Sequence, residues 1–210
     1  MPETNPNERL EAFSDGVFAI AITLLIIEIG ISPSVEIDSV AEFWRALGEI
    51  APSIFAFLLS FTIIFITWAN HHACFKLIDK TCSSFIYANA LMLLTVVFMP
   101  FPTALLGEYI LTDFSSPAVV LYNSVFALQA IAWILLTGAA LRNRLTRDEA
   151  STVAMRMNHR NGYFAFAIYS MLAIAAIWLP QIVAVATTML WIFWLVHGIS
   201  ILKPAGQGRA

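Results

Sequence analysis

Long apolar runs alternate with short polar segments along the whole chain. Each run has about the 20 residues that an α-helix needs to cross the hydrocarbon core of a bilayer. The pattern therefore predicts an all-α integral membrane protein with six transmembrane helices in one domain, residues 1–210. The predicted spans are Phe13–Ile31, Phe43–His71, Ser84–Leu106, Pro117–Leu141, Gly162–Leu179 and Gln181–Leu202.

Prolines and polar residues mark the expected breaks between and within these spans. Pro100 and Pro102 lie inside the third span, where their missing amide donors should kink the helix. Pro180 alone separates the fifth and sixth spans, so these two should form a tight hairpin. The polar segment Arg142–Asn161 is expected to connect the fourth span to the fifth.

The composition agrees with a bilayer environment. Of the 210 residues, 60% are hydrophobic and only 12% are charged, and the mean hydropathy is +0.79. Soluble domains carry about 25% charged residues. The first apolar run follows an acidic, polar N-terminus and lacks a small-residue cleavage site, so it is expected to remain as a membrane helix rather than to act as a signal peptide.

Basic residues lie almost entirely on one side of the predicted topology, with Arg45 alone on the other. Lys and Arg near span ends resist translocation and mark the cytoplasmic side. The residues on that side are Arg9, Lys76, Lys80, Arg142, Arg144, Arg147, Arg156, Arg160, Lys203 and Arg209. We therefore expect a multi-pass protein of the cell membrane whose terminal segments, residues 1–12 and 203–210, are both cytoplasmic.

Acidic residues gather on the opposite, outer side. These residues are Glu36, Asp38, Glu42, Glu49, Glu108 and Asp113. Such a group can concentrate cations near an outer mouth. The alternative is that they are solvated loop residues with no further role.

Ionisable residues occur where the first predicted span begins and where the second ends. An ionisable side chain in a membrane helix normally has a partner, because leaving it unpaired costs at least ~2.5 kcal/mol. Both positions are on the inner side, so their side chains should lie at the same depth. We expect an inner polar cluster there, with an interfacial belt as the alternative for the tryptophan and the histidines. Its members are Arg9, Ser14, Asp15, Trp68, Asn70, His71 and His72.

An apolar stripe runs along the first predicted span. On a helical wheel at 100° per residue, its members lie within about 60° of Ile20. They are Phe13, Gly16, Val17, Thr23, Leu24, Ile27 and Ile31. A stripe of this kind either lines a pore or packs against another helix. Ser14 and Asp15 lie about 120° or more away from Ile20 and face neighbouring helices instead.

Two motifs resemble those of a known family. The segment Arg9-Leu-Glu-Ala-Phe13-Ser14-Asp15 and the segment Trp68-Ala-Asn70-His71-His72-Ala-Cys74-Phe75 resemble the signatures of the endosomal and lysosomal potassium channel family, transmembrane protein 175, in its bacterial branch. The resemblance implies one six-helix unit per chain and a homotetramer in which the first helix lines a central pore. It also implies hydrophobic constrictions at Ile20, Leu24 and Ile27 and a hydroxyl layer at Thr23.

The resemblance predicts a potassium-permeable cation channel of modest selectivity, since the chain has no T-V-G-Y-G filter. The expected partners are further copies of the chain, membrane lipid, and potassium and other monovalent cations, without nucleic acid or a cofactor. A secondary transporter or a proton-leak pathway is the alternative, although no charged residue lies at the centre of a predicted span.

Neither an enzyme nor a metal site is expected. The catalytic motifs G-x-S-x-G and H-E-x-x-H do not occur in the chain. His71, His72, Cys74 and Cys82 have side chains of the ligand type, but their spacing matches no standard zinc pattern.

Overall fold

The computed structural model describes residues 6–30 and 37–201. These residues form eight α-helices and one 3₁₀ helix and contain no β-strand, only an isolated bridge between Ile78 and Thr146. The all-α prediction is therefore confirmed for the described part of the chain. In order, the elements are α1 (Pro6–Leu24), η1 (Leu25–Glu28), α2 (Val40–Glu49), α3 (Ala51–Phe75), α4 (Ser83–Phe98), α5 (Pro100–Tyr109), α6 (Ser115–Arg142), α7 (Glu149–Ala175) and α8 (Pro180–Ile201).

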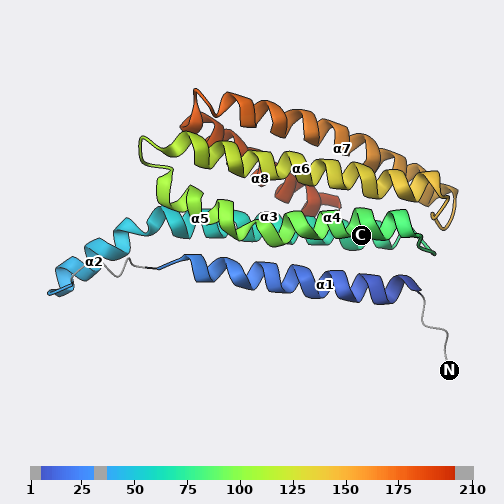
Figure 1. Cartoon of the computed structure of the whole chain (residues 1–210), viewed down its shortest axis with the longest axis horizontal. Coiled ribbons are helices and arrows are strands. Elements are labelled where there is room, and N and C mark those ends of the chain that lie inside the picture. The colour runs from blue at the N-terminus through green and yellow to red at the C-terminus, as the bar shows by residue number, and fades with distance from the viewer. Residues whose placement is uncertain (1–5, 31–36, 202–210) are drawn as a thin grey trace, which may run out of the picture.

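The long helices lie side by side in an elongated bundle (Figure 1). Helix α1 forms one edge of the bundle and contacts α3 and α4, whereas α6 and α7 pack along each other at the opposite edge. Helix α2 projects from one end and contacts the rest of the described chain only weakly, through α3. One side of α1 therefore stays uncovered by the described residues of its own chain.

Four stretches of the described residues are long and apolar enough to cross a membrane. They are Asn7–Ile27, Ala51–Phe75, Ser83–Tyr109 and Ser115–Arg142. In α8, side chains are described only as far as Ile192. The stretch Pro180–Ile192 is apolar but shorter than the four candidate spans. These lengths establish a multi-helix membrane protein with four candidate spans among the described residues.

The second predicted span is wrong in its first part. The structure breaks it at Ile50, so that Phe43 belongs to the short helix α2 and the long helix α3 begins at Ala51. Pro52 explains the break, because proline lacks an amide donor and fits only the first turn of a helix. Helix α2 starts separately, at Val40. The side chain of the preceding Ser39 caps it by accepting a hydrogen bond from the Glu42 amide at 3.2 Å.

The polar segment Arg142–Asn161 is also more ordered than a connecting loop. Helix α7 begins at Glu149 and includes the second half of this segment. Asp148 caps the helix by accepting a hydrogen bond from the Ser151 amide at 2.7 Å. Sequence hydropathy missed these first turns because a helix that extends beyond the bilayer carries polar side chains.

Both proline predictions are confirmed. The third predicted span divides into α4 and α5 at Met99, directly before Pro100. Helix α7 ends at Ala175 and α8 begins at Pro180, which makes a tight hairpin. The ends of the first and sixth predicted spans, Ile31 and Leu202, lie outside the described residues, as do residues 1–5 and 203–210 of the predicted cytoplasmic termini.

Two glycines allow close approach between neighbouring helices. A Cβ atom on Gly107 of α5 would lie 2.7 Å from the Cα atom of Ser53 in α3, and one on Gly162 of α7 would lie 2.8 Å from the Ile134 side chain in α6. Membrane helices associate through such small residues because lipid supplies no hydrophobic drive for helix pairing. These contacts bring α5 close to α3 and α7 close to α6.

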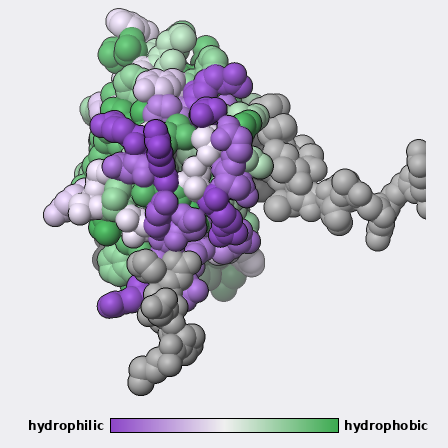
Figure 2. Space-filling view, turned by 90° about the vertical axis from the view of Figure 1, so that its right-hand side faces the viewer, coloured by the Kyte–Doolittle hydropathy of each residue, from purple (hydrophilic) through white to green (hydrophobic). Residues whose placement is uncertain are grey.

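Polar residues collect at the end of the bundle where α1 begins. Figure 2 views this end and shows hydrophilic residues across the described part of the face. Exposed basic residues at the α3–α4 and α6–α7 turns belong to it, namely Lys76, Lys80, Arg142, Arg144 and Arg147. These five members of the predicted basic group thus lie together at one end of the molecule.

Candidate functional site

Helix α1 and the 3₁₀ turn η1 that continues it have two contrasting faces. Ser14, Phe18, Ala21 and Leu25 are buried at 1% exposure or less and pack against the other helices of the chain. The predicted stripe lies on the opposite face, where the exposed fractions are 63% for Phe13, 59% for Ile20, 71% for Ile27 and 38% for Leu24. Gly16 and Thr23 are also exposed. The described side chains of this chain therefore leave the apolar stripe uncovered.

The uncovered face in the structure differs from the predicted stripe at two places. Val17 is half-buried and packs against the core, so it does not belong to the uncovered face. Beyond Leu24 the helix tightens to the 3₁₀ form, which has three residues per turn. Leu24 and Ile27 therefore stack one turn apart on nearly the same line, and Ile26 also becomes exposed at 54%.

The Thr23 hydroxyl occupies the middle of this face. It donates a hydrogen bond to the backbone carbonyl of Ile20 at 2.8 Å. A hydroxyl group has one proton and two acceptor lone pairs. Because the proton is used within the helix, the lone pairs remain free to face an electropositive group on the exposed side.

Asp15 meets Trp68 across the α1–α3 contact. The Trp68 indole N–H donates a hydrogen bond to Asp15 Oδ1 at 2.8 Å. Both residues are half-buried. A charge-assisted hydrogen bond of this length is stronger than a neutral one, so the pair fastens the middle of α1 to the second half of α3.

A second set of contacts is fully buried. The Asn89 side-chain amide of α4 donates to Ser14 Oγ at 3.0 Å, and Ser14 Oγ donates to the Leu10 carbonyl at 2.8 Å. His71 Nε2 lies 2.7 Å from Asn89 Oδ1. Since the amide oxygen can only accept, His71 must donate from Nε2. Its ring is enclosed by Phe18 and Phe75, at centroid distances of 5.3 and 4.6 Å.

His72 extends the cluster toward the end of the bundle. Its Nδ1 atom lies 2.7 Å from Glu11 Oε1 but has no hydrogen-bond partner among the described residues, so the contact is an ion pair when the imidazole is protonated. The His72 ring stacks on Trp68 with an interplanar angle of 16°. Glu11, Asp15, Trp68 and His72 thus form one contiguous group.

The structure brings together five of the seven predicted cluster residues, namely Ser14, Asp15, Trp68, His71 and His72. Arg9 is exposed and makes no hydrogen bond or ion pair with the described residues. Asn70 lies on another face of α3, where it lines a cavity of about 330 Å³ between α3, α6 and α7. Arg9 is therefore not the partner of Asp15 in this subunit.

Two residues of this group were not predicted. Glu11 lies one helical turn before Asp15, so the spacing i, i+4 on one helix face could have indicated it. Asn89 is an isolated amide in a strongly apolar run, and a buried polar group in a membrane helix needs a partner. Its partner could not be named from the sequence because it depends on how α4 packs against α1.

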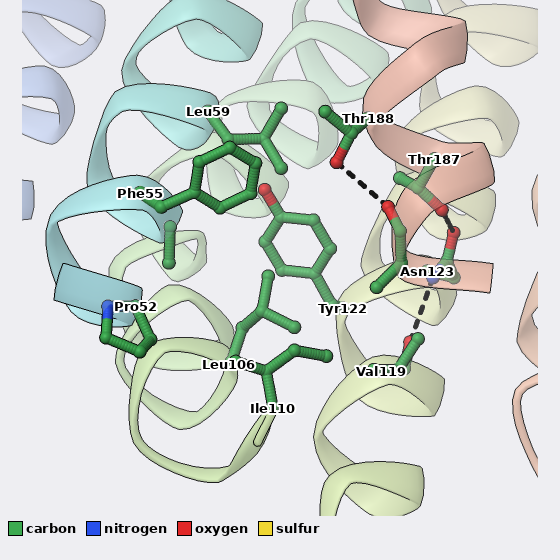
Figure 3. A pocket seen from close by; sticks show the side chains of 12 residues that line it. Pro52, Phe55, Leu59, Leu106, Ile110, Val119, Tyr122, Asn123, Thr187 and Thr188 are labelled. Atoms are coloured by element: carbon green, nitrogen blue, oxygen red, sulfur yellow. Dashed lines mark hydrogen bonds between the residues drawn. The ribbon is translucent and has the colours of Figure 1, made fainter. Parts of the chain in front are cut away.

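A smaller cavity lies between α3, α5, α6 and α8 (Figure 3). Tyr122 and Asn123 of α6 line it, and Asn123 Oδ1 accepts a hydrogen bond from Thr187 of α8 at 2.9 Å. The Tyr122 hydroxyl contacts Ser60 at 2.8 Å. The volume is about 30 Å³, which has room for about one water molecule. This cavity is too small for an organic ligand.

Comparison with known proteins gives consistent matches. Residues 9–100 match the family described as the endosomal/lysosomal potassium channel TMEM175. Over 182 residues the chain is 39% identical to a protein of Chamaesiphon minutus named as a potassium channel, covering 85% of this chain and 89% of that relative. A protein of Streptomyces collinus with the same description is 42% identical over 130 residues, covering 61% of this chain and 62% of the relative.

The fold is similar to that of a solved structure. A crystal structure described as a lysosomal potassium-selective channel TMEM175 homolog from Chamaesiphon minutus superposes with a TM-score of 0.82 at 33% sequence identity. The match covers 92% of this chain and 98% of that one. The family match at residues 9–100 contains the whole uncovered face of α1 and every member of the polar cluster.

Proposed function

Because the chain belongs to the family of the endosomal/lysosomal potassium channel TMEM175, we propose that it is a potassium-permeable cation channel. We propose further that it assembles as a homotetramer in which α1 of each subunit lines a central pore. This family consists of ion channels, which agrees with the expectation that the protein is not an enzyme.

The uncovered apolar face of α1 is the observation that carries the proposal. Ile20 and Ile27 are more than half exposed although they lie in the first candidate span. Four such helices around an axis would give a narrow aliphatic pore with constrictions at Ile20, Leu24 and Ile27. A narrow apolar ring excludes water, so this pore would gate by dewetting.

Modest potassium selectivity would come from Thr23. Four threonine hydroxyls at one level would turn their free lone pairs toward a partly dehydrated cation, because each proton is already donated to Ile20. No T-V-G-Y-G segment supplies a ring of backbone carbonyls instead. Selectivity would then depend on the width of the constriction and on this one hydroxyl layer.

We also propose six passes through the cell membrane with both termini in the cytoplasm. Helix α7 packs along the candidate span α6, and the turn at Pro180 sends α8 back beside it. The Arg and Lys residues of the end shown in Figure 2 would then face the cytoplasm. Lipid would cover the remaining apolar surface.

The transporter alternative would use the cavity beside Asn70. Its volume of about 330 Å³ falls at the lower end of the range for small-molecule sites. Its described polar lining includes Gln129, Asn158 and Asn161 but no charged residue. A cation carrier usually provides charged or carbonyl ligands near the midplane, so this alternative has weaker support. The proton-leak alternative would instead need a water-filled path past the apolar ring.

Ion flux from liposomes tests the function directly. Purified protein in potassium-loaded liposomes should release potassium down its gradient when a protonophore balances charge, and empty liposomes should not. Flux that saturates with potassium and requires a counter-ion would favour the transporter. Proton uptake that dissipates the imposed potential without a protonophore would identify the proton leak.

A further inference from the structure

Three side chains with metal-binding atoms meet at the end of α1 that carries the N-terminus. One ligand atom each from Glu11, Asp15 and His72 lies within 4.8 Å of the other two. The two carboxylates come from successive turns of α1 and the imidazole comes from α3. All three residues are half-buried, so solvent ions can reach them while water screens them only partly.

The contact between His72 and Glu11 needs a proton or a metal cation between the two facing atoms. His72 Nδ1 is buried without a hydrogen-bond partner, yet it lies only 2.7 Å from Glu11 Oε1. Two atoms that both present lone pairs repel each other at this distance unless a proton or a cation lies between them. Asp15, one turn further along α1, adds a second negative charge, and like charges at this spacing are destabilising.

Trp68 holds two of the three side chains in place. Its indole N–H donates to Asp15 Oδ1 at 2.8 Å, which leaves the second carboxylate oxygen for a ligand. Its ring stacks on His72 with centroids 5.8 Å apart. Outer contacts of this kind orient the direct ligands of metal ions and raise affinity.

We propose that Glu11, Asp15 and His72 form a Zn²⁺ site, with one ion per chain. One imidazole nitrogen and two carboxylate oxygens are the ligand types of three-residue zinc sites that keep a fourth position for water. The imidazole disfavours Mg²⁺ and Ca²⁺, which prefer oxygen ligands throughout. The ion neutralises the two carboxylates and cross-links α1 to α3. The sequence had indicated no metal site because His72 is 57 residues from Asp15 and 61 from Glu11 along the chain.

Calorimetric titration of the purified channel with Zn²⁺ alone tests this site without measuring ion flux. The wild-type chain should bind one Zn²⁺ per subunit and gain thermal stability on binding. Glu11→Gln and His72→Gln should each weaken binding at least tenfold. His159→Gln is the matched control, because His159 contacts Thr137 on another helix pair and its loss should leave the affinity unchanged.

Several results would overturn the proposal. These are unchanged Zn²⁺ affinity in His72→Gln, no binding by a wild-type protein that is folded, and displacement of Zn²⁺ by a hundredfold excess of Mg²⁺. If His72→Gln does not fold, Co²⁺ binding to wild-type protein and to Glu11→Gln decides instead. With wild-type protein, the visible spectrum of bound Co²⁺ should indicate nitrogen and oxygen ligands. With Glu11→Gln, this spectrum of bound Co²⁺ should be absent.

Discussion

Ile20 and Ile22 are two positions apart on α1 but have different surroundings. Ile20 is 59% exposed on the uncovered face, whereas Ile22 packs partly against the core of its own subunit. In the proposed tetramer, Ile20→Asn would place an amide at one of the proposed constrictions and favour its wetting. Lowering the barrier by about 1.4 kcal/mol would raise potassium flux about tenfold, which liposome flux measures.

Ile22→Asn is the matched control for this substitution. It buries an amide against protein, which costs about 1–3 kcal/mol, so it should lower thermal stability without increasing flux. If Ile20→Asn instead behaves like Ile22→Asn, with poor assembly and no gain in flux, the stripe packs against protein. The channel proposal would then lose its main physical support.

Thr23 tests selectivity separately from conduction. Thr23→Val keeps the shape of the side chain but removes the hydroxyl that donates to Ile20. We expect the potassium-to-sodium permeability ratio to fall toward unity with little change in thermal stability, because the exposed hydroxyl contributes little to packing. Reversal potentials in bilayers under bi-ionic conditions measure the ratio. A Thr23→Ser variant, which keeps the hydroxyl, should retain the wild-type preference.

Asp15 tests the α1–α3 contact. Asp15→Ala leaves the Trp68 indole N–H without its acceptor, which should cost about 1–3 kcal/mol and lower the thermal midpoint of the purified protein. Asp15→Asn keeps an acceptor oxygen at the same position and should lose less. Equal midpoints for Asp15→Ala and wild type would show that the hydrogen bond does not stabilise the fold.

At the scale of the helix, the capping of α7 makes its first turn sensitive to acid. The hydrogen bond from the Ser151 backbone amide lowers the pKa of Asp148 below its ordinary value. A group with a lowered folded-state pKa stabilises the fold fully above its unfolded pKa and loses that effect as pH falls through the folded value. Amide hydrogen exchange at Ser151 should therefore show full protection near neutral pH.

Protection should weaken only at strongly acidic pH. Asp148→Ala should remove the cap and speed exchange in the first turn of α7 wherever wild type keeps its protection, and the two should converge at strongly acidic pH. Asp148→Asn should preserve much of the protection, because asparagine also caps helices. Exchange in the middle of α7 should be unchanged in both variants. An acid-sensitive Ser151 amide in Asp148→Ala would contradict this assignment.

At the scale of the whole molecule, cysteine labelling can test whether the polar end shown in Figure 2 faces the cytoplasm. With Cys82 replaced by serine, Asp113→Cys should react with an impermeant thiol reagent added to intact cells, and Lys80→Cys should react only after permeabilisation. Both positions are exposed in the structure, and the native Cys74 is fully buried. The opposite labelling pattern would overturn the orientation inferred from the basic residues.

The sequence determined what depends on local chemistry. Apolar run length predicted the membrane helices, because the thickness of the bilayer fixes the number of residues that cross it. Pro100 and Pro180 predicted a kink and a hairpin because proline lacks an amide donor. The Phe13-Ser14-Asp15 signature indicated the family. The helical wheel of α1 selected most of the described residues that the structure leaves uncovered, but it included Val17 and missed Ile26.

Only the tertiary structure decided which polar groups meet. Asp15 pairs with Trp68 and not with Arg9, and Asn89 connects Ser14 to His71. Such pairs depend on the rotation and depth of each helix against its neighbours, which are set by many small packing contacts along both helices. The meeting of Glu11, Asp15 and His72 has the same cause: periodicity places residues on a face of their own helix, but packing chooses which face of which neighbour they contact.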